Sequence, residues 1–301
     1  MTHNEYIRNA TDVTGLTVGP FRYVFSAYCN WGVDILRKLR LHLATTDASI
    51  FDNVDRYIHI VAAHTRDLSA QSLRSHLPGN ISELNWQQEE NRINSLWFAD
   101  DSRHAIWTKA SAPELGRPRF EFPWSLLIND ITARNGGLIH AGLASHKGSG
   151  LLFLAPPTGG KTTTLNTAPS DWQVLSDDAA LVWPGDEGQW LASPLPAWGQ
   201  VTNPSRSWYS ESMNLDKPCS LKSLLILTKS RQMSLTRVAD SAAMPHVYRA
   251  LSEYPVTIIS EASQAESWFR SSASMCRDLH CWELCLPLHA DIWPLVAREA
   301  A

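Results

Sequence analysis

Lys161 follows two glycines at the end of an apolar run, in LLFLAPPTGGKTTTL (Leu151–Leu165). A phosphate-binding loop, or P-loop, has the pattern G-x-x-x-x-G-K-[ST]; its backbone amides surround the phosphates, its lysine reaches them and its hydroxyl binds Mg²⁺. Gly160 and Thr162 complete the second half of that pattern, whereas Ala155 stands where the first glycine belongs. The pattern predicts a strand, a P-loop and a short helix. The alternative is a Gly/Thr-rich turn with a surface lysine.

A phosphate-binding loop needs backbone amides that point inward and small residues that let phosphate oxygens approach. An alanine at position 155 is tolerable if its φ is negative. The two prolines that follow it have no N–H group to donate, but the amides that bind phosphate come mostly from later in the loop. The sequence predicts ATP and Mg²⁺ as ligands, and we expect contacts with the triphosphate from Thr158, Gly159, Gly160, Lys161, Thr162 and Thr163.

An acidic pair, Asp177 and Asp178, follows the next strand-like run, WQVLS. A Mg²⁺–ATP site also needs a carboxylate at the end of a neighbouring strand. We expect Asp178 to hold Mg²⁺ together with Thr162, and Asp177 to accept the proton of an attacking hydroxyl. Strand geometry could exchange these two roles, and in isolation an acidic pair is more often a solvated turn.

His140 lies in GGLIHAGLA, upstream of the loop. GLIHAGLASH and GLLFLAPP are predicted to be two strands joined by a hairpin turn at 147–150. If these strands are neighbours, the imidazole would approach the phosphates from the side; the alternative is a histidine satisfied within the core. The predicted catalytic residues are therefore Asp177, His140 and Lys161.

The segments HAG, APPTGGKTT and LSDD, in this order and spacing, resemble the HPr kinase/phosphorylase superfamily. The longer run from PWSLLINDITARN to SPLPAWG is similar to the SynChlorMet cassette proteins, which are HPr-kinase-related. The resemblance implies an α/β fold with α+β character and a compact P-loop core, like that of HPr kinase and phosphoenolpyruvate carboxykinase. It places a kinase domain at 121–301, after a mixed α/β N-terminal region at 1–120 whose role is unknown.

The function expected from these residues is an ATP-dependent kinase that transfers the γ-phosphate to a hydroxyl, with serine of a protein or peptide as the acceptor. The resemblance adds a possible place in a peptide-modification pathway. The alternatives are a kinase for a small serine-like molecule and a non-catalytic ATP-binding scaffold. Two departures, Thr163 in place of the usual glutamate and SPLPAWG in place of a glycine-rich signature, weaken the case for phosphorylase activity and for HPr as the substrate. An arginine should complete the site, and the candidates are Arg206, Arg231 and Arg237.

The composition and charge of the whole chain limit the classes of partner that we expect. The 301 residues are 44% hydrophobic and 19% charged with a formal net charge of −4, so they carry no electrostatic footprint for nucleic acid or an anionic membrane. No apolar run approaches the ~20 residues that span a bilayer, and the N-terminal segment lacks the features of a signal peptide. We therefore expect a cytoplasmic protein whose partner is the hydroxyl acceptor rather than nucleic acid or a membrane, with a homo-oligomer also possible.

The five cysteines argue against a disulfide framework because their number is odd. In CRDLHCWELCLPLH, alternation predicts a buried strand with Cys281, Glu283 and Cys285 on one face, in preference to a metal site. Elsewhere, helices are predicted at 33–43, in PWSLLINDITARN and in AAMPHVYRALSEY, and a strand at 56–64. KSLLILTK and MSLTRV are predicted to pair as a hairpin.

Overall fold

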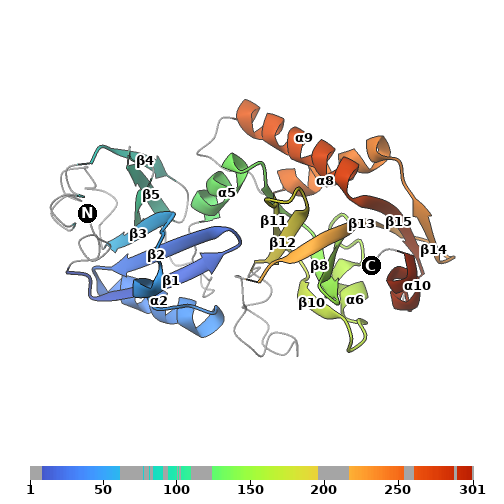
Figure 1. The fold of residues 1–301 in the computed structure, drawn as a ribbon, viewed down its shortest axis with the longest axis horizontal. Coiled ribbons are helices and arrows are strands. Elements are labelled where there is room, and N and C mark those ends of the chain that lie inside the picture. Colours follow the sequence, from blue (N-terminus) through green and yellow to red (C-terminus); the bar gives the residue numbers. More distant parts are fainter. Residues whose placement is uncertain are drawn as a thin grey trace. The chain divides into compact units, whose positions relative to one another are not determined.

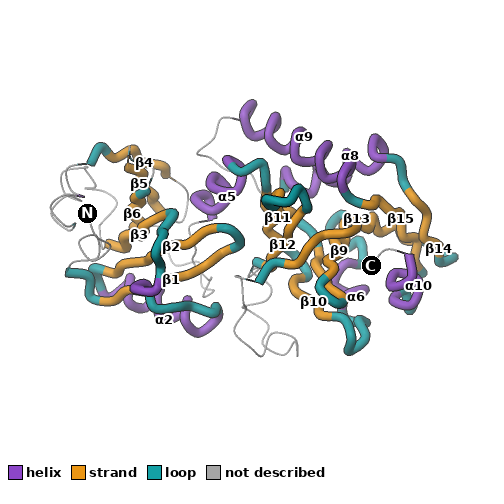
Figure 2. Tube along the Cα trace, viewed as in Figure 1, coloured by secondary structure: helices purple, strands orange, loops and turns teal. Residues whose placement is uncertain are grey.

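The fold was obtained as a computed structural model that describes residues 9–61, 77, 81, 84–90, 94–99, 101, 103–109, 124–195, 217–253, 261–287 and 290–299. The predicted α/β class is confirmed, because the chain forms two mixed β-sheets together with several helices (Figures 1 and 2). The described residues up to Lys109 belong to one compact unit, and those from Trp124 onward belong to a second.

The first unit is a six-stranded sheet. Its strands are β1 (Asp12–Val18), β2 (Phe21–Ala27), β3 (Arg56–Val61), β4 (Trp86–Glu90), β5 (Asn94–Ala99) and β6 (His104–Lys109), in the order β1-β2-β3-β6-β5-β4. The short helix η1 (Ala48–Ile50) contacts β1, and the helix α2 (Asn30–His42) contacts β1 and β2. The helix predicted at 33–43 and the strand predicted at 56–64 are both confirmed, although the described strand ends at Val61.

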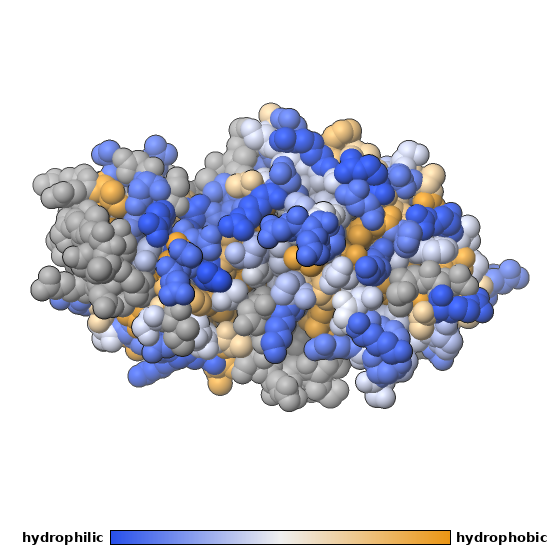
Figure 3. Space-filling view, in the orientation of Figure 1, coloured by the Kyte–Doolittle hydropathy of each residue, from blue (hydrophilic) through white to orange (hydrophobic). Residues whose placement is uncertain are grey.

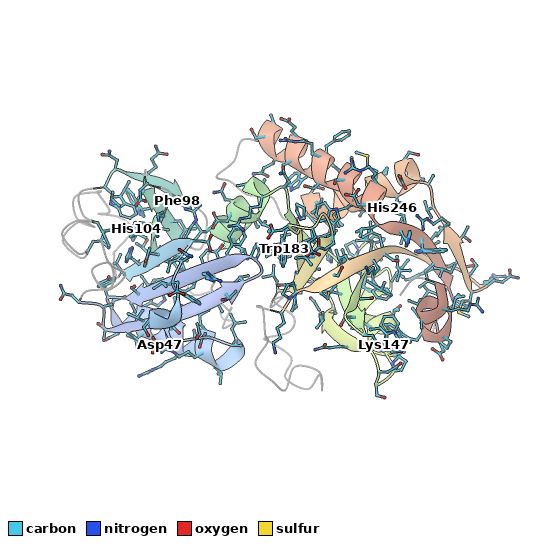
Figure 4. All side chains as sticks on the ribbon, in the orientation of Figure 1. Asp47, Phe98, His104, Lys147, Trp183 and His246 are labelled. Atoms are coloured by element: carbon cyan, nitrogen blue, oxygen red, sulfur yellow. The ribbon has the colours of Figure 1, made fainter. Side chains whose placement is uncertain are left out.

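Two histidines lie within the core of this first unit. His59 and His104 stack on each other on neighbouring strands, and their rings are joined by a hydrogen bond of 3.0 Å (His104 is labelled in Figure 4). Burial lowers the pKa of His59 to about 3 and that of His104 to about 4. Both rings are therefore neutral near pH 7, which suits a core position.

The second unit contains the segment Leu151–Leu165, for which a phosphate-binding loop was predicted. Its nine-stranded sheet is formed by β7 (Gly137–Ile139), β8 (Gly142–His146), β9 (Ser149–Leu154), β10 (Gln173–Ser176), β11 (Ala180–Pro184), β12 (Trp190–Pro194), β13 (Cys219–Lys229), β14 (Ser234–Arg237) and β15 (His280–Leu286). The helices are α5 (Trp124–Ala133), α6 (Lys161–Leu165), α8 (Asp240–Ser252), α9 (Glu261–Asp278) and α10 (Trp293–Glu299).

Alternation along the central strands divides the core of this unit into two layers. Leu152 and Leu154 of β9 pack in a cluster with residues of α8 and α9, whereas Leu151 and Phe153 pack in a cluster with residues of α6 and α10. Successive side chains of a strand point to opposite faces, so helices cover both faces of the sheet (Figure 1). The strand β9, which leads into the loop, is therefore buried on both faces.

The strand β15 fits the prediction made from the cysteine-rich segment. Cys281 packs in the α8/α9 layer, whereas Trp282 and Leu284 pack in the α6/α10 layer, as alternation requires. The predicted hairpin between KSLLILTK and MSLTRV is wrong, because β14 pairs with β15 and not with β13. Over Ser223–Ile226, β13 is already bonded to β9 on one edge and to β15 on the other, so it has no free edge there for β14.

The strand predicted for GLIHAGLASH is also wrong as a single element. It is split into β7, which pairs with β11, and β8, which pairs with β9 and β10, and the break falls at His140 and Ala141. The predicted hairpin from β8 to β9 is confirmed, with its turn at Lys147 and Gly148 (Lys147 is labelled in Figure 4).

Among the described residues, no helix is both long enough and apolar enough to cross a membrane. Hydrophilic residues cover most of the described surface on the face drawn in Figure 3, and apolar residues lie between them in small groups.

Candidate active site

The chain leaves β9 at Leu154 and turns through a loop with unusual backbone angles before α6 begins at Lys161. Gly160 has φ +105°, where glycine is strongly favoured, and an added Cβ there would meet no atom within 4 Å. Thr158 also has a positive φ, +62°, which is uncommon for a residue with a side chain. Such outliers cluster at ligand-binding sites, where the surrounding structure holds them in place. The observed strand–loop–helix is the arrangement that a P-loop requires.

Ala155 packs against the loop where the pattern expects glycine. A Cβ added at Gly159 would lie 2.6 Å from the Ala155 Cβ and 2.8 Å from the Pro156 carbonyl oxygen. The turn is closed by a hydrogen bond from the Gly159 amide to that same oxygen, 2.9 Å. The alanine is therefore compatible with the loop as long as residue 159 has no side chain.

We therefore expect Gly159→Ala to destabilise the second unit, because the new Cβ would lie less than 3 Å from two atoms of the turn. Overpacking of this kind costs about 1–3 kcal/mol, measurable by urea unfolding. The double variant Ala155→Gly/Gly159→Ala should recover part of that loss, since it removes one of the two clashes. An unfolding free energy for Gly159→Ala equal to that of the wild type would contradict the described loop geometry.

Lys161 is buried at the start of α6, with 7% of its surface exposed. Its Nζ donates a hydrogen bond to the Ala155 carbonyl oxygen, 2.7 Å, so the side chain folds back over the loop. Burial lowers the pKa of Lys161, and the nearby carboxylates of Asp178 and Asp177 oppose that shift. An ammonium group has three N–H donors, so this lysine can keep the carbonyl contact and still bind phosphate oxygens.

The next side chain, Thr162, joins the loop to the acidic pair. Its hydroxyl donates to a carboxylate oxygen of Asp177 at 3.1 Å, and Asp177 is itself only 6% exposed. The pair lies in the connection from β10 to β11, where the Ser176 Oγ accepts the backbone amides of Asp178 and Ala179 at 3.4 and 3.3 Å. A hydroxyl in contact with one carboxylate, with a second carboxylate lining the same cavity, is an oxygen donor set that suits Mg²⁺, so the residues present fit this cation.

The other member of the pair, Asp178, belongs to a chain of polar side chains. His140 contacts an Asp178 carboxylate oxygen through Nε2 at 3.1 Å, and it contacts a Glu253 carboxylate through Nδ1. The hydrogen bond from His140 is the largest cause of the lowered pKa of Asp178, and Lys161 acts in the same direction. Asp178 is thus held as an anion by the imidazole, which a second carboxylate orients.

We expect His140→Phe to raise the pKa of Asp178 toward the ordinary value of 3.8 for a free carboxyl group, because the largest cause of the depression is lost. Carbon-detected NMR titration of aspartate carboxyl groups would measure this, and Asp171, which contacts His146 elsewhere in the same unit, serves as the internal control. An unchanged Asp178 titration would contradict the contact with His140.

The break between β7 and β8 places His140 in this chain. Its backbone amide donates to the Ala250 carbonyl oxygen, 2.9 Å, near the C-terminal end of α8, where carbonyls lack partners within the helix. Glu253 is the residue that ends α8. A long-range contact with α8 therefore fixes both the backbone of His140 and its second carboxylate.

The arginine that lies near the loop is Arg249, which was not one of the three candidates predicted from the sequence. Arg249 of α8 lies 3.7 Å from Glu253 and close enough to Lys161 to affect its pKa. His246, labelled on α8 in Figure 4, and Arg249 border a small recess that Ala155 and Pro156 close. The (i, i+4) spacing of Arg249 and Glu253 was visible in the sequence, but nothing local indicated where α8 would pack.

The sequence candidates for this arginine lie elsewhere. Arg237 hydrogen-bonds His280 at 2.6 Å and stacks over Trp282 on β15. Arg231 lies in the turn between β13 and β14, and Arg206 lies outside the described residues. Within the described part of the chain, neither Arg231 nor Arg237 lines the cavity beside the loop.

That cavity brings the predicted residues together. It measures about 470 Å³ and is open on one side to solvent. Every residue expected to bind nucleotide or metal or to act in catalysis lines it, together with two prolines: His140, Pro156, Pro157, Thr158, Gly159, Gly160, Lys161, Thr162, Thr163, Asp177 and Asp178. Segments that precede and follow the loop in the sequence thus meet at one site.

Comparison with known proteins gives a match to a family and matches to solved structures. The model of the SynChlorMet cassette protein ScmC family matches residues 124–298. Among solved structures, the chain is similar to the Hpr(Ser) kinase/phosphatase from Coxiella burnetii with 13% identity and a TM-score of 0.27, over 53% of this chain and 90% of that one. No curated protein matches the chain.

Proposed function

The chain belongs to the SynChlorMet cassette protein ScmC family, and we propose that it is an ATP-dependent kinase that phosphorylates a hydroxyl, with serine of a protein or peptide as the acceptor. The observation that carries the proposal is the convergence of Lys161, Thr162 and the acidic pair on one open cavity. In this assignment residues 121–301 form the kinase domain, and residues 1–120 form a mixed α/β N-terminal region whose role is unknown.

Phosphoryl transfer depends mainly on positioning and on charge stabilisation. Loop residues Thr158 to Thr163 would hold the triphosphate, and Lys161 would neutralise charge on its β- and γ-phosphates. Bound Mg²⁺ would supply further neutralisation of that charge. The acceptor oxygen forms a bond to the γ-phosphorus while the bond to the β–γ bridging oxygen breaks, and ADP leaves with that oxygen.

The geometry favours an exchange of the roles expected for the two acids. Thr162 contacts Asp177, so these two oxygen donors are best placed to hold Mg²⁺. Asp178 contacts the imidazole of His140, which stabilises its charge and orients it. We therefore assign the acceptance of the hydroxyl proton to Asp178, with His140 and Glu253 as positioning residues, and metal binding to Thr162 and Asp177.

The acceptor class is tested by incubating the protein with ATP labelled in the γ-phosphate and Mg²⁺, in the presence of serine-containing peptides, whole-cell protein or free serine. Label in a peptide or protein that depends on Lys161 supports the proposal. Label only in free serine or a similar metabolite would make the protein a small-molecule kinase. Tight ATP binding without any transfer would leave a nucleotide-binding scaffold.

A further inference from the structure

A second cavity borders the same loop. It measures about 430 Å³, within the range of ~300–1,000 Å³ that is usual for small-molecule sites. Four residues line both cavities: Thr158, Gly159, Gly160 and Thr163. The acidic pair, His140 and Lys161 line only the first. The loop is therefore a shared wall between a charged cavity and a second cavity that these charged side chains do not line.

The second cavity opens at one edge of the sheet. The strands β9, β13 and β15 are parallel, and their carboxyl ends lead into the loop, into Lys229 and Ser230, and into Leu286 and Pro287. The Ser230 amide donates to the Leu286 carbonyl oxygen, 3.0 Å, which joins the two latter ends. In α/β sheets, ligands bind outside the carboxyl ends of parallel strands.

The lining combines apolar walls with a few polar groups. Leu286, Pro287 and Ala290 form the apolar part, and the Lys229 amine and the Ser230 hydroxyl are polar. Thr164 also lines this cavity; it is 5% exposed, and its hydroxyl has no hydrogen-bond partner among the described residues. A buried hydroxyl without a partner is costly unless a ligand supplies one. Flat apolar ligands with a few hydrogen-bonding atoms suit such a lining.

The direction of a bound triphosphate follows from the first cavity. In a P-loop the lysine reaches the β- and γ-phosphates, so the γ end would face the acidic pair, which lines the same cavity as Lys161. The α-phosphate would then point away from that pair, toward Thr163, which lines both cavities. The group attached to the α-phosphate then leaves the loop beside Thr163 and Thr167, where the second cavity begins. An acceptor hydroxyl would not react from there, because it must reach the acids of the first cavity.

We propose that the second cavity binds the nucleoside, base and ribose, of the ATP whose triphosphate rests on the loop. This inference rests on the proposed function and adds to it the site of nucleotide selection. The base packs against Leu286, Pro287 and Ala290, and the Lys229 amine, the Ser230 hydroxyl and the Thr164 hydroxyl supply its polar contacts.

The test compares ATP with inorganic tripolyphosphate, both with Mg²⁺, by titration calorimetry. Tripolyphosphate has the phosphates without the nucleoside, so the wild type should bind ATP about 10–100-fold more tightly, the range of one buried base contact. Ala290→Trp, which fills the cavity, should remove that preference while leaving tripolyphosphate binding unchanged. Ala297→Trp, at an exposed position of α10, is the matched control and should behave as the wild type.

The outcomes separate the two proposals. If neither compound binds, the phosphate site itself is wrong; if both bind equally to the wild type, only the nucleoside site is wrong. A second measurement uses the unaltered protein, in case the tryptophan variant fails to fold. Photolabelling with 8-azido-ATP should modify peptides that contain Lys229, Ser230 or Pro287, and labelling confined to the segments around His140 or Asp177 would overturn the inference.

Discussion

Lys161→Ala is expected to lose most of the stabilisation that Mg²⁺–ATP gives to the wild-type protein. A ligand that binds only the native state at 100 times its dissociation constant stabilises it by about 2.7 kcal/mol, which is seen as a rise in melting temperature. Lys161 is the buried cation of the loop, and its loss leaves the β- and γ-phosphates without their closest positive charge. Differential scanning fluorimetry with and without nucleotide measures the effect.

The control is Lys222→Ala, which removes an exposed lysine of β13 in the same unit and should keep the full ATP shift. The melting temperature without nucleotide must be recorded for both variants, because Lys161 also makes the internal bond to the Ala155 carbonyl oxygen. Equal ATP shifts in the wild type and in Lys161→Ala would remove the P-loop interpretation, whatever the stability of the free protein.

Asp177→Asn and Asp178→Asn are expected to impair different steps, ATP binding in the first variant and phosphate transfer in the second. The contact of Asp177 with Thr162 assigns it to the metal, so Asp177→Asn should weaken the Mg²⁺-dependent part of ATP binding. Asp178→Asn should leave that binding nearly intact and lower the rate of transfer by ~10²–10⁴-fold, as is typical when a general base is lost. Titration calorimetry at several Mg²⁺ concentrations, followed by single-turnover transfer, separates the two effects.

His140→Phe is a third variant to compare with the two aspartate variants. If His140 acts by orienting Asp178, the variant should lose transfer rate while ATP still binds, and the acidic limb of its pH profile should move to higher pH because the pKa of Asp178 rises. The reverse pattern, with Asp178→Asn losing metal-dependent binding and Asp177→Asn losing only rate, would restore the assignment expected from the sequence. Identical losses of binding and rate in both aspartate variants would contradict any division of roles.

Much of this site could be predicted from the sequence because its parts are local. The loop from Thr158 to Thr163 lies within one strand–turn–helix, and the acidic pair follows the next strand, so residue types and spacing were sufficient to find both. Ala155 was an obstacle only in the pattern, since its side chain occupies the room left free by Gly159. The burial of β9 on both faces was equally visible in its continuous apolar run.

The features that were missed all depend on contacts between distant segments. Arg249 and Glu253 reach the site because α8 packs beside β7, and that contact also breaks the strand expected through His140. The hairpin expected for β14 failed for a similar reason, because the parallel strand β15 already occupies the edge of β13. Hydrophobic periodicity identifies a strand but does not determine its neighbours.

The second cavity could not be predicted from the sequence either, because it also depends on contacts between distant segments. Apart from the loop and α6, its residues come from the end of β13 and from the segment that follows β15, which are far apart in the sequence and carry no shared motif. Lys229 and Ser230 resemble an ordinary polar turn when read alone. The parallel order β9–β13–β15 brings their carboxyl ends to the loop that follows β9.

A structure of the protein crystallised with Mg²⁺ and a non-hydrolysable ATP analogue would test the proposed nucleotide site directly. We expect the β- and γ-phosphates to lie within hydrogen-bonding distance of Lys161 and of the amides around Gly160, with the cation bound by Thr162 and Asp177 and the γ end facing Asp178. A triphosphate bound elsewhere, or bound at the loop with its γ end turned away from both aspartates, would contradict it.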